Sequence, residues 1–292
     1  MQNSENKFSD YIAGKYGLSD DFSQVRLKIG QTITADRINI AQCNRDITTG
    51  KMLRPLMLLL CGNLSGPLSQ KHIDAASVVE IIHYASLVHD DIIDSALTRR
   101  DCKNIRSQKG DKYAVMLGDW LMSTALDSLL KSDAALVIAD IVSTVKSMCE
   151  GEMLQNELLF SKKITERDYF QITTLKTADF FSCCCVIGAK LSGAGGSDIE
   201  KCRVFGSGFG TAFQIINDIS DFKTARSDIR NGQKTLPEFR LENLSTTELS
   251  ITSSLKTAYD YLEKAVDSIK NFDGQAAKGL IEICDHFKTE GA

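Results

Sequence analysis

Three closely spaced aspartates give the strongest chemical signal in the sequence. Residues 87–94 read LVHDDIID, and in a helix Asp90, Asp91 and Asp94 would share one face. Like charges stacked in this way destabilise a helix unless a cation lies between them, and the flanking apolar residues indicate a partly buried setting. The cluster therefore suits a hard cation that prefers oxygen ligands, such as Mg²⁺.

A second oxygen-rich cluster follows an apolar approach of the same kind. Residues 213–222 read FQIINDISDF, in which Asn217, Asp218 and Asp221 repeat the spacing of the first cluster. One such cluster is often only a solvated or capping turn, but two of them, each among apolar residues, are harder to explain that way. Mg²⁺ typically binds one or two protein carboxylates and leaves its other positions to water and substrate phosphate. We therefore expect a diphosphate held by metal ions inside a helical bundle.

Basic residues near these clusters supply the cations that phosphate binding also needs. They are Lys51 and Arg54 in GKMLRP, Arg99 and Arg100 after the first cluster, and Lys234 in GQKTLP. Any one of them alone is an ordinary surface charge. Arginine forks, however, bind phosphate oxygens in a bidentate manner, and the positions beside acids and glycines favour a functional role.

The surrounding pattern predicts that helices position these groups. Apolar residues recur in steps of three and four over residues 68–100 and again over 255–269, and no sustained alternation with a period of two occurs. Only three prolines occur in 292 residues, so helix breakers are scarce. The sequence therefore predicts an all-α protein.

The chain divides at short breaks rather than at linkers. Breaks fall at residues 62–67, 193–197 and 224–237, and none is long enough to separate domains. We expect one all-α domain over residues 1–292, in which residues 1–20 form a loose polar lead-in with one short helix.

Composition and charge exclude several other classes of protein. With 34 basic and 38 acidic residues, the net charge of −4 provides no general attraction for nucleic acids. The longest apolar run, around residues 55–61, is far shorter than the ~18 residues of a membrane span. The polar start MQNSENKFSD lacks the features of a secretory leader, so we expect a cytoplasmic protein.

Other common motifs are absent or have a simpler explanation. The nine cysteines, three of them adjacent at 183–185, are expected to be reduced and buried. No phosphate loop, Gly-x-Ser-x-Gly elbow or His-x-x-x-His pair occurs. Gly206, Gly208 and Gly210 follow no strand, so we interpret them as small residues that let two helices approach rather than as a dinucleotide loop.

The order of the motifs resembles that of the trans-isoprenyl diphosphate synthases (polyprenyl synthetases). It runs GKMLRP, HYASLVHDDIID, RR, GDWL, GEMLQ, LKTADFF, FGTAFQIINDISDF and GQKTLP, from Gly50 to Pro237. The resemblance implies an all-α isoprenoid synthase bundle around a deep central cavity, usually a homodimer. It implies condensation of isopentenyl diphosphate with an allylic diphosphate (geranyl, farnesyl or longer), with up to three Mg²⁺ ions bound beside the allylic diphosphate.

The resemblance also implies a role for each motif residue. The metal ions would be held by Asp90, Asp91, Asp94, Asn217, Asp218 and Asp221. Isopentenyl diphosphate would be bound by Lys51, Arg54, His83 and Arg100. The allylic diphosphate would be contacted by Arg99, Lys176 and Lys234, and oxygens would be presented to the allylic cation by Thr177 and Gln214. Without the resemblance, His83 is interpreted as a packed core histidine, and Lys176 and Gln214 as ordinary helix residues.

The implied reaction is ionisation, condensation and elimination. Metal ions and basic side chains stabilise the departing diphosphate, and the double bond of isopentenyl diphosphate attacks the allylic cation. A proton is then lost to the released diphosphate, since no catalytic His/Glu pair stands out. The apolar interior of the bundle must exclude water, which would otherwise quench the cation.

Three positions depart from the family pattern. Asn217 replaces an acid, so one expected negative charge is missing. The stretch between Asp221 and Lys234 is short and lacks the usual basic Gly-Lys segment, for which Lys223 and Arg226 are candidate substitutes. Asp101 follows the arginine pair where glycine is usual.

Product length is partly readable from the residues before the first acidic cluster. In the family, bulky side chains one turn earlier close the cavity, whereas this chain has the small residues Ala85 and Ser86, with Tyr84 predicted to point away. We therefore expect a product of C20 or longer. Candidates for a floor on the opposing helix are Trp120, Met122 and Leu126.

Two alternatives to an active chain-elongating enzyme remain at this point. Asn217 and the short stretch after Asp221 are also typical of a weakly active or regulatory partner subunit. A cyclase or a peptide prenyltransferase of the same fold is the other alternative. The set Lys51, Arg54 and His83 argues against it, because a cyclase needs no second diphosphate pocket.

Overall fold

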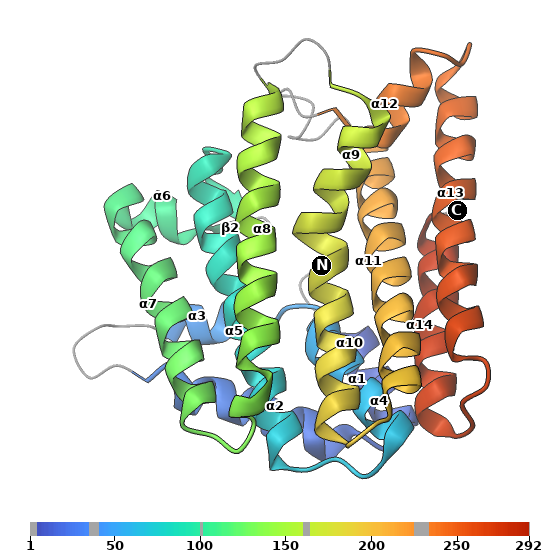
Figure 1. Cartoon of the computed structure of the whole chain (residues 1–292). Helices are drawn as coiled ribbons and strands as arrows, with labels where there is room; N and C mark the ends of the chain where they lie inside the picture. Colours follow the sequence, from blue (N-terminus) through green and yellow to red (C-terminus); the bar gives the residue numbers. More distant parts are fainter. Residues whose placement is uncertain (1–4, 35–40, 100–101, 160–163, 225–233, 292) are drawn as a thin grey trace.

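The computed structural model describes residues 5–34, 41–99, 102–159, 164–224 and 234–291. These residues are almost entirely helical (Figure 1), which confirms the predicted all-α class. The α-helices are α1 (Glu5–Lys15), α2 (Ser19–Thr32), α3 (Ala41–Thr48), α4 (Leu53–Ser65), α5 (Gln70–Ile93), α6 (Ile105–Lys109), α7 (Asp111–Leu130), α8 (Ile138–Leu159), α9 (Glu166–Thr173), α10 (Asp179–Leu191), α11 (Gly196–Thr224), α12 (Leu236–Leu241), α13 (Thr247–Ile269) and α14 (Gln275–Gly291).

Three short elements complete the described chain. Strands β1 (Thr98–Arg99) and β2 (Cys102–Lys103) pair antiparallel directly after α5. A 3₁₀ turn, η1 (Ala135–Val137), leads into α8, and a π-helical turn, η2 (Thr174–Ala178), joins α9 to α10.

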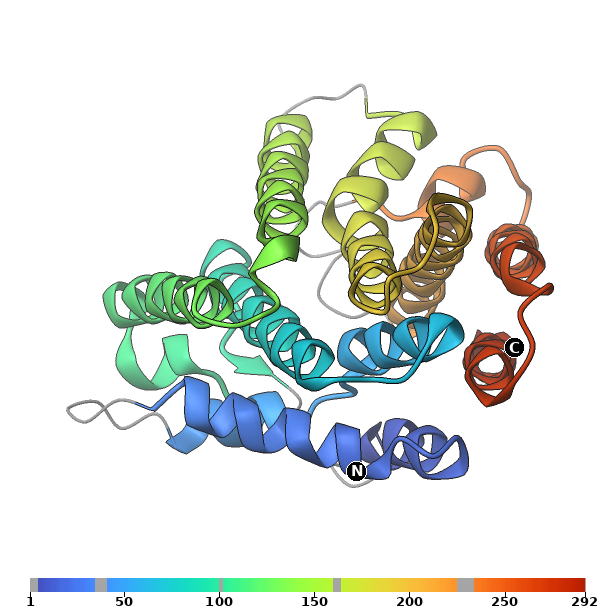
Figure 2. The ribbon, with the colours of Figure 1, turned by 60° about the horizontal axis from the view of Figure 1, so that its bottom comes forward.

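The helices form a bundle in which α10 packs on both α4 and α11, α5 packs on α7, and α11 packs on α13. Figure 2 shows the N-terminal helices as a layer along α4 and α5, with α13 and α14 at one side of the bundle, where α14 lies next to α1. The predicted breaks are confirmed at two places, because α4 ends at Ser65 before α5 begins at Gln70, and α10 ends at Leu191 before α11 begins at Gly196.

Small residues allow the central helices to approach very closely. A Cβ at Gly188 of α10 would lie 2.1 Å from the carbonyl oxygen of Leu58 in α4, and one at Gly206 of α11 would lie 2.6 Å from Ser182 Cα in α10. A Cβ at Gly210 would lie 2.7 Å from Ala178 Cα. The interpretation of the 206–210 glycines as helix-contact residues is therefore confirmed.

The N-terminal segment differs from the expected loose lead-in. Its one short helix, α1, is present, but Ile12 and Ala13 are fully or almost fully buried in the hydrophobic core. The hydroxyl of Tyr16 donates to Glu282 in α14, and the Lys15 ammonium lies 2.7 Å from the same carboxylate. Apolar burial and these contacts to α14 fix α1 against the bundle.

All nine cysteines lie in the described segments and carry free thiols. Seven are buried as predicted, whereas Cys102 and Cys149 are exposed. Among the described helices, the continuous stretch Glu166–Leu191 is long and apolar enough to cross a membrane, but its most apolar window is 67% buried inside the fold. Its apolar side chains therefore contribute to the core.

A buried histidine joins α5 to the end of α10. His72 is fully buried; the Ser69 amide donates to its Nδ1 at 3.1 Å, and its Nε2 lies 2.9 Å from Ser192 Oγ. Because the Ser192 hydroxyl donates to the carbonyl oxygen of Gly62 at 2.7 Å, it accepts from Nε2–H. His72 is therefore neutral, and burial lowers its pKa below the usual 6.5.

Because His72 is buried and neutral, we expect the folded protein to lose stability in mild acid. Below its ordinary pKa of 6.5, the unfolded chain binds a proton at His72 that the folded chain does not. The free energy of unfolding should then fall by up to about 1.4 kcal/mol per pH unit until the lower folded pKa is passed. Denaturant titrations of the parent and of His72→Gln between pH 7.5 and 5 measure this slope; equal slopes in both proteins contradict the prediction.

Candidate active site

A cavity of about 730 Å³ lies among α4, α5, α8, α9, α10 and α11. Part of its wall is apolar and contains Met122, Val145, Met148, Phe181 and Phe213. The remainder carries charged and amide groups from helices that are far apart in the sequence. The cavity thus combines a polar region with an apolar region.

Most of the predicted site residues meet on this wall. They are Lys51, Arg54, His83, Asp90, Asp94, Arg99, Lys176, Thr177, Gln214, Asn217, Asp218 and Lys234. The structure does not place Asp91 or Asp221 on the wall. Arg100, Asp101 and Arg226 lie outside the described residues.

Two carboxylates of the first cluster face the cavity from the end of α5. Asp90 lies in the last turn, and Asp94 is the residue at the C-cap, where the helix dipole is already negative. Burial raises the pKa of Asp90 to about 6, although Lys176 opposes this shift. The two carboxylates and the C-terminal end of the helix create a negative potential, and because water solvates it poorly here, a bound cation is favoured.

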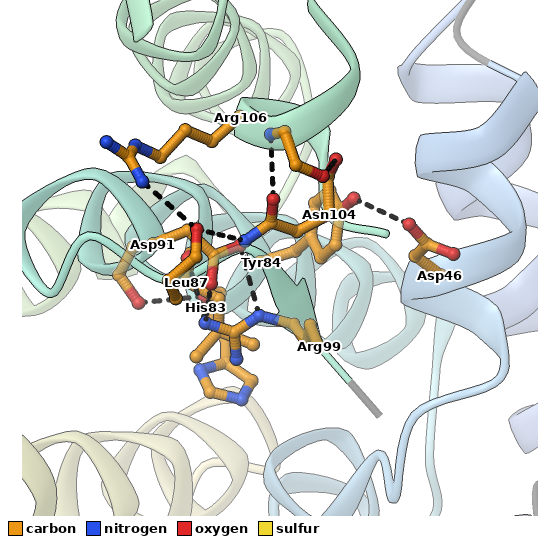
Figure 3. A network of polar contacts seen from close by, with 11 residues as sticks. Asp46, His83, Tyr84, Leu87, Asp91, Arg99, Asn104 and Arg106 are labelled. Carbon is orange, nitrogen blue, oxygen red and sulfur yellow. Dashed lines mark hydrogen bonds and ion pairs between the residues drawn. The ribbon is translucent and has the colours of Figure 1, made fainter. Parts of the chain in front are cut away.

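Asp91 points elsewhere because adjacent helix residues differ by about 100° in direction. Its carboxylate is 5% exposed and pairs with Arg99, with Nη2–Oδ1 at 2.9 Å and Nε–Oδ2 at 3.3 Å (Figure 3). The same Arg99 Nη2 donates to the carbonyl oxygen of Leu87 at 3.0 Å. Asp91 therefore pairs with a basic residue of the wall and does not itself line the cavity, and its metal ligation stays a prediction from the motif.

The turn after α5 is fixed by two further side chains. Asn104 Nδ2 and Arg106 Nη1 donate to the carbonyl oxygen of Ala96 at 3.0 and 3.3 Å (Figure 3).

Tyr84 of α5 contacts α3. Its hydroxyl donates to Asp46 Oδ2 at 3.0 Å, and both residues lie on the cavity wall. The predicted orientation of Tyr84 away from the cavity is therefore wrong, since this contact with α3 holds its ring there.

On α11, hydrogen bonds hold both oxygens of Asp218. Oδ2 accepts from the Tyr169 hydroxyl at 2.6 Å, and Oδ1 accepts from Gln214 Nε2 at 2.8 Å. Gln214 Oε1 in turn accepts from the Thr177 hydroxyl at 2.9 Å. Sequence reasoning missed Tyr169, although its position seven residues before Lys176 places both on one side of a helix.

The π-helical turn η2 presents Lys176 and Thr177 to the cavity. Such turns are rare and often occur at functional sites. The Lys176 ammonium pairs with Glu152 of α8 and donates to Gln155 Oε1 at 3.0 Å. Gly151 permits this contact, because a Cβ there would lie 2.8 Å from Lys176 Cγ. Glu152 and Gln155 were not predicted as site residues, although the motif GEMLQ contains both.

The basic groups from the start of α4 lie deeper. Arg54 is 9% exposed, and its guanidinium lies 4.8 and 4.5 Å from the ring centres of Phe180 and Phe181. Its Nε has no hydrogen-bond partner among the described residues. Glu80, also buried and on the wall, provides a compensating charge that sequence reasoning missed. His83 lies on the wall beside Phe180, rather than wholly inside the core.

The donor set fits Mg²⁺ that is completed by substrate oxygens. Within the described part of the chain, no three His, Cys, Asp or Glu side chains converge tightly enough to bind a metal by themselves. Mg²⁺ usually keeps several waters and binds through one or two carboxylates plus phosphate. Asp90 and Asp94 on α5, with Asp218 and the Asn217 amide on α11, provide suitable oxygens around one cavity.

Comparison with known proteins decides the family. The profile described as polyprenyl synthetase matches residues 39–271. The chain belongs to the polyprenyl synthetase family. The geranylfarnesyl diphosphate synthase of Methanosarcina mazei is 30% identical to it over 244 residues, covering 82% of each chain. The all-trans-nonaprenyl-diphosphate synthase (geranyl-diphosphate specific) of Rhodobacter capsulatus is 31% identical, covering 94% of this chain and 86% of that one.

Other polyprenyl synthetases extend the comparison. Component 2 of the heptaprenyl diphosphate synthase of Bacillus subtilis is 29% identical, covering 91% of this chain and 80% of its own. The crystal structure of a Caulobacter crescentus polyprenyl synthase, complexed with calcium and isoprenyl diphosphate, has a TM-score of 0.88 at 24% identity and covers 98% of both chains. The predicted family, the fold and the chain-elongating prenyltransferase class are confirmed.

Proposed function

We propose that this polyprenyl synthetase joins isopentenyl diphosphate to an allylic diphosphate (geranyl, farnesyl or longer) in a Mg²⁺-dependent reaction, with a product of C20 or longer. The observation that carries the proposal is one cavity lined by carboxylates of α5 and α11 and by five basic side chains. These are Lys51, Arg54, Arg99, Lys176 and Lys234. Two sets of cations suit two diphosphates, which supports condensation rather than cyclisation. The names of the relatives support the product length.

Each group has a defined task in this proposal. Mg²⁺, when bound by Asp90, Asp94, Asn217 and Asp218, supplies Lewis-acid stabilisation of the departing diphosphate. Arg99, Lys176 and Lys234 neutralise the charge that develops on the diphosphate as it leaves. Lys51 and Arg54 hold isopentenyl diphosphate, and His83 adds a polar contact.

The remaining groups protect and orient the allylic cation. Thr177 and Gln214 present oxygens to it, and their mutual hydrogen bond fixes both side chains. The apolar wall, including Phe181 and Phe213, excludes water. The proton lost after condensation passes to the released diphosphate.

Product analysis tests the proposal. Purified protein is incubated with Mg²⁺, isopentenyl diphosphate and, separately, geranyl, farnesyl or geranylgeranyl diphosphate, and the dephosphorylated products are separated by chromatography. We expect chains of C20 or longer, and no product when a chelator removes the metal. A protein that elongates none of the primers, alone or with a partner subunit, contradicts the proposal.

A second candidate is a subunit that elongates only with a partner. Two observations favour it: Asn217 replaces an acid on the wall, and the relative from Bacillus subtilis is named as one component of a synthase. Activity that appears only when a second subunit is added would support this candidate.

We also propose that the protein is a homodimer in the cytoplasm. Light scattering during size-exclusion chromatography measures the assembly, and cell fractionation measures the location. A monomer in solution, or recovery of the protein in another compartment, contradicts the respective statement.

A larger side chain at Ser86 is expected to shorten the product. This half-buried residue lines the cavity one turn before Asp90, so a phenylalanine there would occupy space used by the growing chain. We expect Ser86→Phe to shorten the main product by at least one isoprene unit, as measured by chromatography. An unchanged product distribution in a folded variant contradicts this assignment.

The neighbouring position serves as the matched control. Ala85 is fully buried in the core and is not on the wall, so we expect its side chain, unlike that of Ser86, not to limit the cavity length. A phenylalanine at this position should instead overpack the core and cost about 1–3 kcal/mol of stability.

Of the predicted floor residues, Met122 lies on the wall, whereas Trp120 and Leu126 pack against the core.

A further inference from the structure

The loop before α4 holds an unusual backbone conformation. It carries Lys51, and the next residue, Met52, has φ 46° and ψ 35° in the left-handed region. This conformation is unfavourable for a residue with a side chain, so its surroundings must hold it there. The direction in which Lys51 leaves the loop therefore depends on the contacts of this loop.

One of these contacts comes from the N-terminal helix. Ser9 of α1 is fully buried, and its hydroxyl donates to the carbonyl oxygen of Lys51, 42 residues further along the chain. This hydrogen bond fixes the peptide that joins Lys51 to Met52. It therefore holds the strained conformation in place.

A second contact comes from the C-terminal helix. The Lys51 ammonium lies 6.0 Å from the ring centre of Phe287 in α14, at the outer limit of a cation–π contact. Phe287 is 2% exposed and packs edge-on against Phe213, which lines the cavity, with ring centres 5.4 Å apart. The Phe287 ring is thus in contact with Phe213 on one side and with the Lys51 ammonium on the other.

The two terminal helices are also joined to each other. Phe8 of α1 stacks on His286 of α14 with ring centres 3.7 Å apart, and Lys15 pairs with Glu282 at 2.7 Å. These contacts make α1 and α14 a single support for the loop. Neither helix contributes a residue to the cavity wall within the described chain.

We infer that α1 and α14 together position Lys51 for isopentenyl diphosphate, with Ser9 and Phe287 as positioning residues that act through it. The inference rests on the proposed function, in which Lys51 binds the second diphosphate. It predicts an effect on one substrate only, because the groups proposed to hold the allylic diphosphate lie on α5, β1, η2, α11 and the segment before α12.

Steady-state kinetics with each substrate varied in turn provide the test. Ser9→Ala should raise KM for isopentenyl diphosphate about fivefold or more and leave KM for the allylic diphosphate within twofold of the parent. Ser9→Thr, which keeps the hydroxyl, should restore the parent value. Ser23→Ala is the matched control, since Ser23 also bonds a backbone carbonyl but is exposed on α2.

A second variant keeps the inference testable if Ser9→Ala fails to fold. Phe287→Leu keeps an apolar side chain of somewhat smaller volume and removes the ring, and it should raise the same KM about twofold or more. If KM for isopentenyl diphosphate stays unchanged in folded variants, or if KM rises equally for both substrates, the inference is wrong.

Direct binding separates this inference from the proposed function. Calorimetric titration with isopentenyl diphosphate, without a primer, measures affinity without turnover. If the parent protein binds isopentenyl diphosphate and elongates a primer, and Ser9→Ala binds it with the same affinity, only the inference is overturned. Parent protein that binds it more tightly than Ser9→Ala but elongates nothing supports the inference and overturns the proposed function. Parent protein that neither binds it nor elongates a primer overturns both.

Discussion

Replacing Asp90 by alanine is expected to lower turnover by at least about 100-fold, because residues that merely orient metal ligands already cost 10–100-fold when changed. Asp90 faces the cavity from the last turn of α5, where the helix dipole and restricted solvation favour a cation. The folded state should survive, since burial already disfavours the charged form and raises the pKa of this carboxyl to about 6.

Two measurements check the result. Turnover with a saturating allylic substrate reports the catalytic loss, and thermal denaturation reports the fold. Asp127→Ala is the matched control, because Asp127 is an exposed acid of α7 whose ion pair with Lys131 contributes little. Turnover within a few fold of the parent would show that Asp90 holds no essential metal ion.

Removing one hydroxyl at Tyr169 should weaken Mg²⁺ binding about 10-fold or more. The Tyr169 hydroxyl donates to Asp218 Oδ2 at 2.6 Å, and Gln214 holds the other oxygen, so the carboxylate has one fixed orientation. Tyr169→Phe keeps the ring contacts with Phe170 and Phe239 and removes the hydroxyl that bonds Asp218. Asp218 can then rotate, and it loses a donor that favours its charged form.

The Mg²⁺ affinity is measured by calorimetry in the presence of inorganic pyrophosphate, and turnover is measured as a function of Mg²⁺ concentration. Tyr259→Phe provides the control, since its hydroxyl donates to the carbonyl oxygen of Lys288, a residue that is not on the cavity wall. If both variants bind Mg²⁺ as the parent does, Asp218 is not a ligand that depends on Tyr169.

The features that sequence predicted best depend on local helix geometry. Asp90 and Asp94 are four residues apart on one helix, so their shared direction follows from the helical period alone. The same period, applied more strictly, would have directed Asp91 to another side. Its partner Arg99 lies beyond a turn whose path depends on Asn104 and Arg106, which no periodic pattern reveals.

The missed residues make contacts between distant elements. Tyr169 reaches Asp218 across 49 positions, and Glu152 reaches Lys176 from another helix. The place of Ala85 has a related cause, because packing rather than spacing decides whether a residue next to a wall residue faces the cavity or the core. Tertiary contacts of this kind require the positions of both helices, which single-sequence patterns do not supply.

In the proposed function, helix α5 carries both the acids that face the diphosphate and the side chains that face the hydrocarbon tail. From Asp90 back to Ser86 is about 6 Å along the axis, and each further turn adds about 5.4 Å. Because the helix is continuous from Gln70 to Ile93, these intervals are constant. On this proposal, substitutions along one stripe of α5 are expected to change tail length in discrete increments while the chemistry at the head group stays the same, and they would provide a graded series of enzymes from this one scaffold.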